Sequence, residues 1–207
     1  MAKRATDRRV QRTRQLLQDA LISMMIEKGY EATTVQDIID RANVGRATFY
    51  AHFADKETLL TSRLEDLRSF LSERERQAPR SLGFSLAMLE HARSHLPVWA
   101  AIVGRDSGAL VLQRIQSMIA ALVDVDLRAL AFKGTPAQRD LAVQYIAGAF
   151  MAVLTWWLDQ GAKLPPDEVD AIFRRLVLQG VAGEWGLRAN AKGKASSDNV
   201  RRERISG

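Results

Sequence analysis

Hydrophobic residues recur along this 207-residue chain at helical spacing, and no segment shows the strict alternation of a half-buried strand. Two short helices are expected within residues 33–53. Longer helices are expected over about residues 7–28, 55–77, 84–95, 108–131, 135–160 and 166–180. Glycines, prolines and capping residues separate these segments. The pattern therefore predicts an all-α fold of about nine helices.

The two short helices lie close together around a turn. Thr33 or Thr34 is a suitable N-cap for the first, and Gln36 stands where a capping box with Thr33 would need it. Residues 43–45, Asn-Val-Gly, then break the periodicity with residue types that suit a tight turn. This is the layout of a helix-turn-helix, whose second helix enters the major groove of DNA. An ordinary helical hairpin with a solvated polar face has the same pattern.

The second short helix carries chemistry suited to DNA. Phe49 and Phe53 are four residues apart and are expected to anchor it in the core. Near its start, Arg46 is suited to guanine O6 and N7, and Ala47 is small enough to approach a thymine methyl group. Donors suited to phosphate oxygens are spread over this segment and its flanks: Thr34, Thr48, Tyr50, His52 and Lys56.

An ordered run of motifs in the first quarter of the chain resembles the TetR family of bacterial repressors. The run contains Thr13-Arg14, then Glu-Lys-Gly-Tyr at 27–30 and Thr33-Thr34, and ends with Phe-Tyr-Ala-His-Phe at 49–53 and Lys56. The resemblance implies that Arg46 and Ala47 face the bases, that Val35 adds a contact, and that the DNA backbone is held by Thr34, Thr48, Tyr50, His52 and Lys56. Gly45 departs from the family, which often has serine or another polar residue there, so a side-chain cap is missing.

The resemblance also implies how the chain is divided. A three-helix helix-turn-helix DNA-binding domain is expected over residues 1–56, and a larger helical bundle for ligand binding and dimerisation over 57–182. Residues 183–207 lose the hydrophobic periodicity and predict a disordered basic tail. The implied function is a transcriptional repressor that binds a palindromic operator as a homodimer and is released by a small apolar or amphipathic effector. An effector-independent regulator or an activator is the alternative.

Charge and cysteine content narrow the class of protein. Lysine and arginine total 30 against 24 aspartate and glutamate, a formal net charge of +6. Residues 1–14 hold six basic residues and one acidic residue, which fits either an arm on the DNA backbone or a solvated terminus. The absence of cysteine excludes disulfides and thiolate chemistry. We expect no membrane span and no signal peptide, and therefore a cytoplasmic protein.

The expected helix over 135–160 is apolar almost all round, so it must be buried on several sides. A central helix of a monomeric core would satisfy this pattern, and so would a helix packed against both its own core and a twin subunit. The TetR resemblance implies the second arrangement. Interface candidates are Tyr145, Gly148, Ala149, Ala152, Trp156, Phe173 and Leu176.

His91 and His95 are one helical turn apart, a spacing that can chelate a metal ion. However, no glutamate follows the first histidine directly, and no third ligand is evident. We therefore expect no metal and no cofactor, and a metal-dependent enzyme using this pair is only a remote alternative. The TetR resemblance instead implies an effector pocket, whose candidate lining residues are Phe70, Met88, His91, His95, Trp99, Met118, Phe150 and Trp157.

Overall fold

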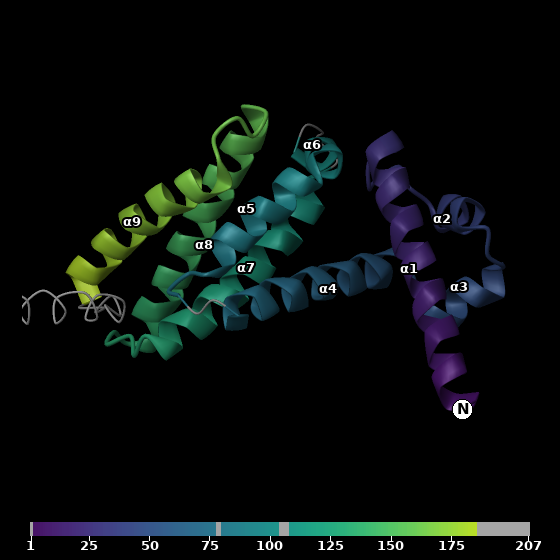
Figure 1. Ribbon diagram of the computed structural model, residues 1–207, viewed down its shortest axis with the longest axis horizontal. Helices are drawn as coiled ribbons and strands as arrows, with labels where there is room; N and C mark the ends of the chain where they lie inside the picture. The colour runs from purple at the N-terminus through teal and green to yellow at the C-terminus, as the bar shows by residue number, and fades with distance from the viewer. Residues whose placement is uncertain (1, 78–79, 104–107, 186–207) are drawn as a thin grey trace, which may run out of the picture.

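The computed structural model describes the backbone of residues 2–77, 80–103 and 108–185, and the side chains of 8–77, 80–103 and 108–180. This part of the chain forms nine helices and no strand (Figure 1), which confirms the predicted all-α class. The helices are α1 Ala2–Lys28, α2 Val35–Ala42, α3 Arg46–His52, α4 Lys56–Gln77, α5 Phe84–Ser94, α6 Leu96–Val103, α7 Ala109–Ala129, α8 Pro136–Asp159 and α9 Pro166–Trp185.

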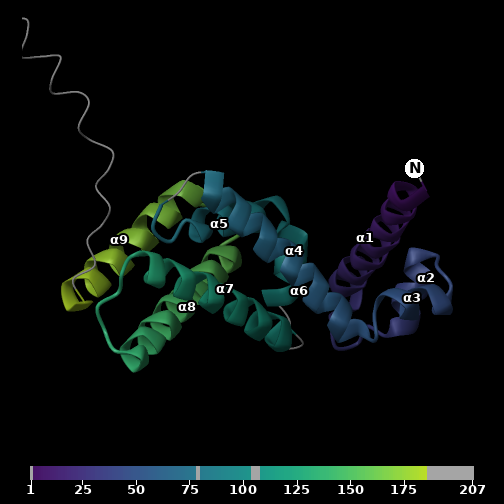
Figure 2. The ribbon, with the colours of Figure 1, turned by 90° about the horizontal axis from the view of Figure 1, so that it is seen from below.

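Helices α1, α2 and α3 gather at one end of the molecule, α9 lies at the other, and α7 runs through the middle (Figures 1 and 2). Gly29 ends α1 with a φ of 84°, which a glycine adopts at low cost. The predicted anchors Phe49 and Phe53 are both buried, so α3 is held by one apolar side. The amide of Thr58 donates to Oδ1 of Asp55 at 2.6 Å, so Asp55 caps the start of α4.

We call α1, α2 and α3 the N-terminal unit and α5 to α9 the body. Helix α4 runs from the N-terminal unit into the body, and side-chain hydrogen bonds join it to α1. Arg14 donates to Oγ of Ser62 at 2.8 Å. Gln18, which is buried, donates to Ser62 at 3.2 Å and to Oδ2 of Asp66 at 2.7 Å. Because buried polar groups are costly to leave unpaired, these bonds fix how α1 sits against α4.

The body contains one helix that was not expected as a separate element. Pro97 lies just beyond the expected helix over 84–95 and stands as the second residue of α6. A proline is tolerated in the first helical turn because the amides there have no intrahelical acceptor. Helix α6 packs against α1, α7 and α8, so this short segment joins the body to the N-terminal unit.

Helix α8 is the central helix of the body. It begins where the expected helix over 135–160 begins: Thr135 and Gln138 form a capping box, and Pro136 is the first helical residue. The rings of Phe84 and Phe173, from α5 and α9, both pack edge-on against Phe150 of α8 at 5.2 Å between centroids. Helix α9 continues through Trp185, beyond the predicted boundary at 182, and residues 186–207 of the predicted tail lie outside the described part of the chain.

Candidate nucleic-acid interface and internal cavity

The turn between α2 and α3 has the geometry that its sequence suggested. Asn43 adopts a left-handed conformation with φ 50° and caps α2, its amide donating to the carbonyl of Asp40 at 3.2 Å. Val44 packs partly against the core between the helices. Gly45 is the N-cap of α3 and supplies no side-chain hydrogen bond, as the sequence predicted.

Helix α3 presents a polar outer face. Arg46, Ala47 and Tyr50 are exposed, whereas Thr48 and His52 are half-buried. The Tyr50 ring packs edge-on against buried Phe49 at 5.3 Å, and the Arg46 guanidinium carbon lies 5.7 Å from the centre of the Tyr50 ring. Among the residues that the structure describes, no carboxylate pairs with Arg46. Arg46 therefore offers its donors to a partner outside the chain.

The capping box of α2 differs by one residue from the predicted one. Thr34, not Thr33, is the N-cap, and its partner is Asp37, not Gln36. Thr33 is buried and donates to the carbonyl of Gly29 at 2.7 Å, which removes it from the helix start. Lys28 and Thr34 hydrogen-bond to Asp37 and hold the pKa of its carboxyl well below its usual range. Thr34 is exposed and Val35 is half-buried at the start of α2.

Lys56 occupies a different setting from the exposed residues of α3. Its ammonium donates to the carbonyls of Tyr30, Glu31 and Thr33 at 2.9, 3.2 and 2.8 Å. The same ammonium lies 4.5 Å from the centre of the Tyr30 ring. All three of its donors are thus used on the loop between α1 and α2, so Lys56 fixes that loop in the free protein.

The basic N-terminal segment is helical in its described part. Arg8, Arg9 and Arg12 are exposed on α1. Arg14 is half-buried, with its guanidinium carbon 4.9 Å from the centre of the Phe53 ring, and it packs α1 onto the end of α3. The side chains of residues 1–7, including two of the basic residues counted in the sequence, lie outside the described part of the chain.

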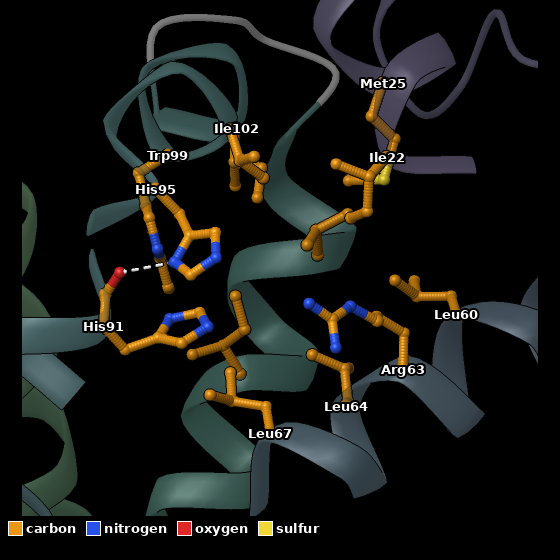
Figure 3. Close-up of a pocket in the computed structure, with 13 residues that line it drawn as sticks. Ile22, Met25, Leu60, Arg63, Leu64, Leu67, His91, His95, Trp99 and Ile102 are labelled. Carbon is orange, nitrogen blue, oxygen red and sulfur yellow. Dashed lines mark hydrogen bonds between the residues drawn. The ribbon is translucent and has the colours of Figure 1, made fainter. Parts of the chain in front are cut away.

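A cavity lies at the junction of the N-terminal unit and the body (Figure 3). It encloses about 70 Å³ and is lined from α1, α4, α5, α6 and α7, by Ile22, Met25, Leu60, Arg63, Leu64, Leu67, His91, His95, Val98, Trp99, Ile102, Val111 and Ile115. A more open cavity of about 400 Å³ adjoins it and shares four of these residues, Arg63, Leu67, His91 and His95. We call these two spaces the inner and outer cavities.

Four of the eight predicted pocket residues line one of the two cavities, and four do not. His91, His95 and Trp99 line the inner cavity, and Phe70 lines the outer one. The other four side chains are buried in the core and do not line either cavity: Met88, Met118, Phe150 and Trp157. Sequence reasoning missed Arg63 and the α1 residues Ile22 and Met25, which face the cavity only because α1 docks against α4 and α6.

The two histidines form a stacked pair, with ring centroids 4.3 Å apart. Nδ1 of His95 lies 2.9 Å from the carbonyl oxygen of His91. Nδ1 of His91 is buried and has no hydrogen-bond partner within the described part of the chain. Burial, then the neighbouring His95 and Arg63, lower the pKa of His91 to about 4, so its imidazole is neutral at physiological pH. Among the described residues no third His, Cys, Asp or Glu joins this pair as a metal ligand would.

A stripe of exposed apolar side chains runs along α8 and α9. Tyr145 and Trp156 are 57% and 51% exposed, and Leu176 is 63% exposed. The small residues Gly148, Ala149 and Ala152 lie along the same stretch of α8, and no described residue lies within 4 Å of a Cβ added at Gly148. Leu141 and Ile172 extend the stripe, which we call the α8–α9 face.

Phe173 does not belong to this face, contrary to prediction, because it is 3% exposed and packs on Phe150. Helix α8 is the one described helix that is long and apolar enough to cross a membrane. Half of its most apolar window is buried inside the protein. Buried core helices share these properties.

Two family models match successive parts of the chain. Residues 17–62 match the model described as bacterial regulatory proteins, tetR family. Residues 82–179 match a model described as a transcriptional regulator C-terminal region. The first match spans the helix-turn-helix, and the second spans most of the body.

Individual relatives agree with these matches. The uncharacterized HTH-type transcriptional regulator YxbF of Bacillus subtilis is 31% identical over 169 residues, which cover 78% of this chain and 43% of the length of YxbF. A TetR transcriptional regulator from Streptococcus agalactiae is 29% identical, with a TM-score of 0.64 over 84% of this chain and 98% of its own. RolR, solved in complex with the ligand resorcinol, shares the fold at 22% identity, with a TM-score of 0.51 over 88% and 92% of the two chains.

Proposed function

The chain belongs to the TetR family of bacterial regulatory proteins, and on that premise we propose that it is a cytoplasmic, DNA-binding transcriptional repressor. The observation that carries the proposal is the outer face of α3. Arg46, Ala47 and Tyr50 are exposed there, while Phe49 holds the opposite side of the helix in the core. A helix presented in this way fits the major groove, with Arg46 and Ala47 toward base edges.

We assign the surrounding polar residues to the DNA backbone. Thr48 and Tyr50 lie on α3, and Thr34 lies at the N-terminus of α2, where free amides favour a phosphate. His52 closes α3, and Val35 extends the contact from α2. Lys56 acts through the loop that it holds, since its donors are already bonded to three carbonyls.

We further propose that the protein acts as a homodimer through the α8–α9 face. One helix-turn-helix reads half a site, and a twofold dimer places two recognition helices about one turn of DNA apart. An exposed stripe of aromatic and aliphatic side chains flanking small residues suits helix-to-helix packing between subunits. Partner protein, rather than lipid, then covers the exposed side of α8.

The inner and outer cavities are proposed as the effector site. Their walls include Ile22 and Met25 of α1, so an occupant touches the DNA-binding unit directly. The fold neighbour RolR was solved with a small ligand, resorcinol. An effector that binds the DNA-incompetent arrangement more tightly than the competent one releases the operator by that difference in free energy.

Selection of bound DNA from a random pool tests the proposed function. We expect enrichment of an inverted repeat whose half-sites are spaced by about one helical turn. A parallel selection with Arg46→Ala should relax the consensus at one position in each half-site and retain the symmetry. Failure to enrich any sequence above the input pool contradicts DNA recognition, and enrichment of a single half-site contradicts the dimer.

A further inference from the structure

We propose that the effector is a small amphipathic monoanion: a compact apolar body bearing one carboxylate, with the carboxylate held by Arg63 and His91. This inference rests on the proposed function, because it names the class of molecule that the proposed effector site takes. It is carried by two residues that line both cavities: Arg63, which has no ion pair among the described residues, and His91, whose buried Nδ1 has no hydrogen-bond partner among them.

Arg63 enters the cavity without a carboxylate partner. Its side chain extends from α4 toward the two imidazoles (Figure 3). Two acidic side chains line the outer cavity: Asp66 accepts a hydrogen bond from the neutral amide of Gln18 at 2.7 Å, and Glu90 forms an ion pair with Arg74 at 2.7 Å. Among the described residues no ion pair to Arg63 is present. A guanidinium held against apolar walls favours a bound anion, and its planar fork matches a carboxylate.

His91 supplies the second polar group. Its Nδ1 is buried and unpaired, whereas Nδ1 of His95 already lies within hydrogen-bond distance of the His91 carbonyl. A neutral imidazole can place its proton on Nδ1 and donate it to a carboxylate oxygen. Burial is the largest cause that disfavours a charged His91, and the Arg63 guanidinium adds to it, so His91 faces a bound carboxylate as a neutral donor.

The rest of the lining selects an apolar body. Beyond Arg63 and the histidines, the inner cavity is bounded by leucine, isoleucine, valine and methionine side chains and by buried Trp99. The outer cavity, whose lining includes Phe70 and Ser94, is the larger and more polar approach. An amphipathic acid entering by this route places its apolar end inward and leaves its carboxylate between Arg63 and His91.

Two matched sets of probes test the class of ligand by calorimetric titration of the full-length protein. The aromatic set is benzoate, benzamide and benzylamine, and the aliphatic set is octanoate and octanamide. We expect at least one carboxylate to bind roughly tenfold or more tightly than its neutral counterpart, the effect expected of a hydrogen-bonded charge pair. Benzylamine should bind more weakly than benzamide because it meets an uncompensated guanidinium.

Variants locate the binding site. Arg63→Gln should weaken the carboxylate roughly ten- to a hundredfold and leave the amide within about twofold. His91→Phe, which keeps a ring of similar shape, should weaken the carboxylate by a smaller factor. Arg68→Gln is the matched control, since Arg68 is exposed on the same helix and does not line either cavity. Thermal midpoints of all three variants show that each is folded.

The outcomes separate this inference from the proposed function. Amide binding as tight as carboxylate binding, no binding of either carboxylate, or an Arg63→Gln affinity equal to that of Arg68→Gln overturns the anion assignment. Release of the selected operator by a neutral compound would also overturn it while leaving the regulator intact. If no operator is selected, the regulatory function fails, and carboxylate binding that depends on Arg63 still stands as a property of the cavity.

Discussion

Trp156→Ala is expected to convert the dimer into folded monomers. The indole is 51% exposed on α8, at one end of the stripe formed by Tyr145, Gly148 and Ala152. A tryptophan side chain buries up to about 250 Å², so about half of that is available to a partner. At roughly 25 cal/mol per Å² this area is worth about 3 kcal/mol per subunit. Because a twofold interface contains Trp156 from both subunits, the variant loses this contribution twice, about 6 kcal/mol in all. That loss corresponds to about a ten-thousandfold change in the dimer dissociation constant.

Sedimentation equilibrium over nanomolar to high micromolar concentrations measures that constant. Leu16→Ala is the matched control, because Leu16 is 42% exposed on α1, at the opposite end of the molecule from the α8–α9 face (Figure 1). Far-ultraviolet circular dichroism should show the same helicity in both variants. A wild-type protein that sediments as one subunit throughout, or equal dissociation constants for the two variants, would refute the assignment of the α8–α9 face.

Four further outcomes are expected. Arg46→Ala should cost about 1–3 kcal/mol of discrimination at one base position per half-site, measured by competition between operators with single base changes. Equal weakening on all sequences would make Arg46 a phosphate contact. Lys56→Met should lower the thermal midpoint and keep the salt dependence of DNA binding, since its three hydrogen bonds are internal. An unchanged midpoint with a salt slope smaller by about one would assign it to a phosphate instead. Burial and the nearby Glu75 raise the pKa of Asp126 to about 7, above its unfolded value, so its stabilising effect is complete below about pH 4 and is lost as pH rises to about 7. Urea denaturation should therefore find Asp126→Asn more stable than wild type at pH 8. Between about pH 4 and pH 8 the stability of this variant should also change less with pH than that of wild type. If both proteins lost the same stability over this range, the pH dependence would belong to other groups. Gly45→Ser should raise stability by a few tenths of a kcal/mol through a new N-cap, because its Cβ meets only Thr48 Oγ1 at 3.7 Å, and a fall in the urea midpoint would show that the added side chain is strained.

Local signals in the sequence were sufficient for most of the helices. Thr135, Pro136 and Gln138 specify the start of α8, and Gly29 and Gly161 end their helices with the positive φ that glycine tolerates. The register error at α2 arose because two adjacent threonines were both plausible caps. Burial of Thr33 against Gly29 decided between them, and that contact depends on how α1 meets α2.

The cavity was harder to predict than the recognition helix. Residues 46–53 carry their chemistry on one short helix, so their spacing alone separates the outer face from the core. The cavity draws on five helices, and large apolar side chains are equally at home in a cavity wall or a packed core. Phe150 and Trp157, for example, lie in the packed core and line neither cavity. Arg63 was missed because only the docking of α1 and α6 against α4 encloses it.

The turn of α4 that carries Arg63 also carries the bonds that position the DNA-binding unit. Ser62 directly precedes Arg63 and accepts from Arg14 of α1, and Asp66, one turn later, accepts from buried Gln18. An anion that draws Arg63 toward His91 pulls on that turn, and α1 must follow or lose hydrogen bonds that are costly to break in a buried setting. Because α1 packs on α2, and α2 on α3, a displacement there alters the spacing of the two recognition helices in a dimer. Operator release then requires only that the ligand favour the displaced arrangement by the 1–3 kcal/mol typical of allosteric coupling.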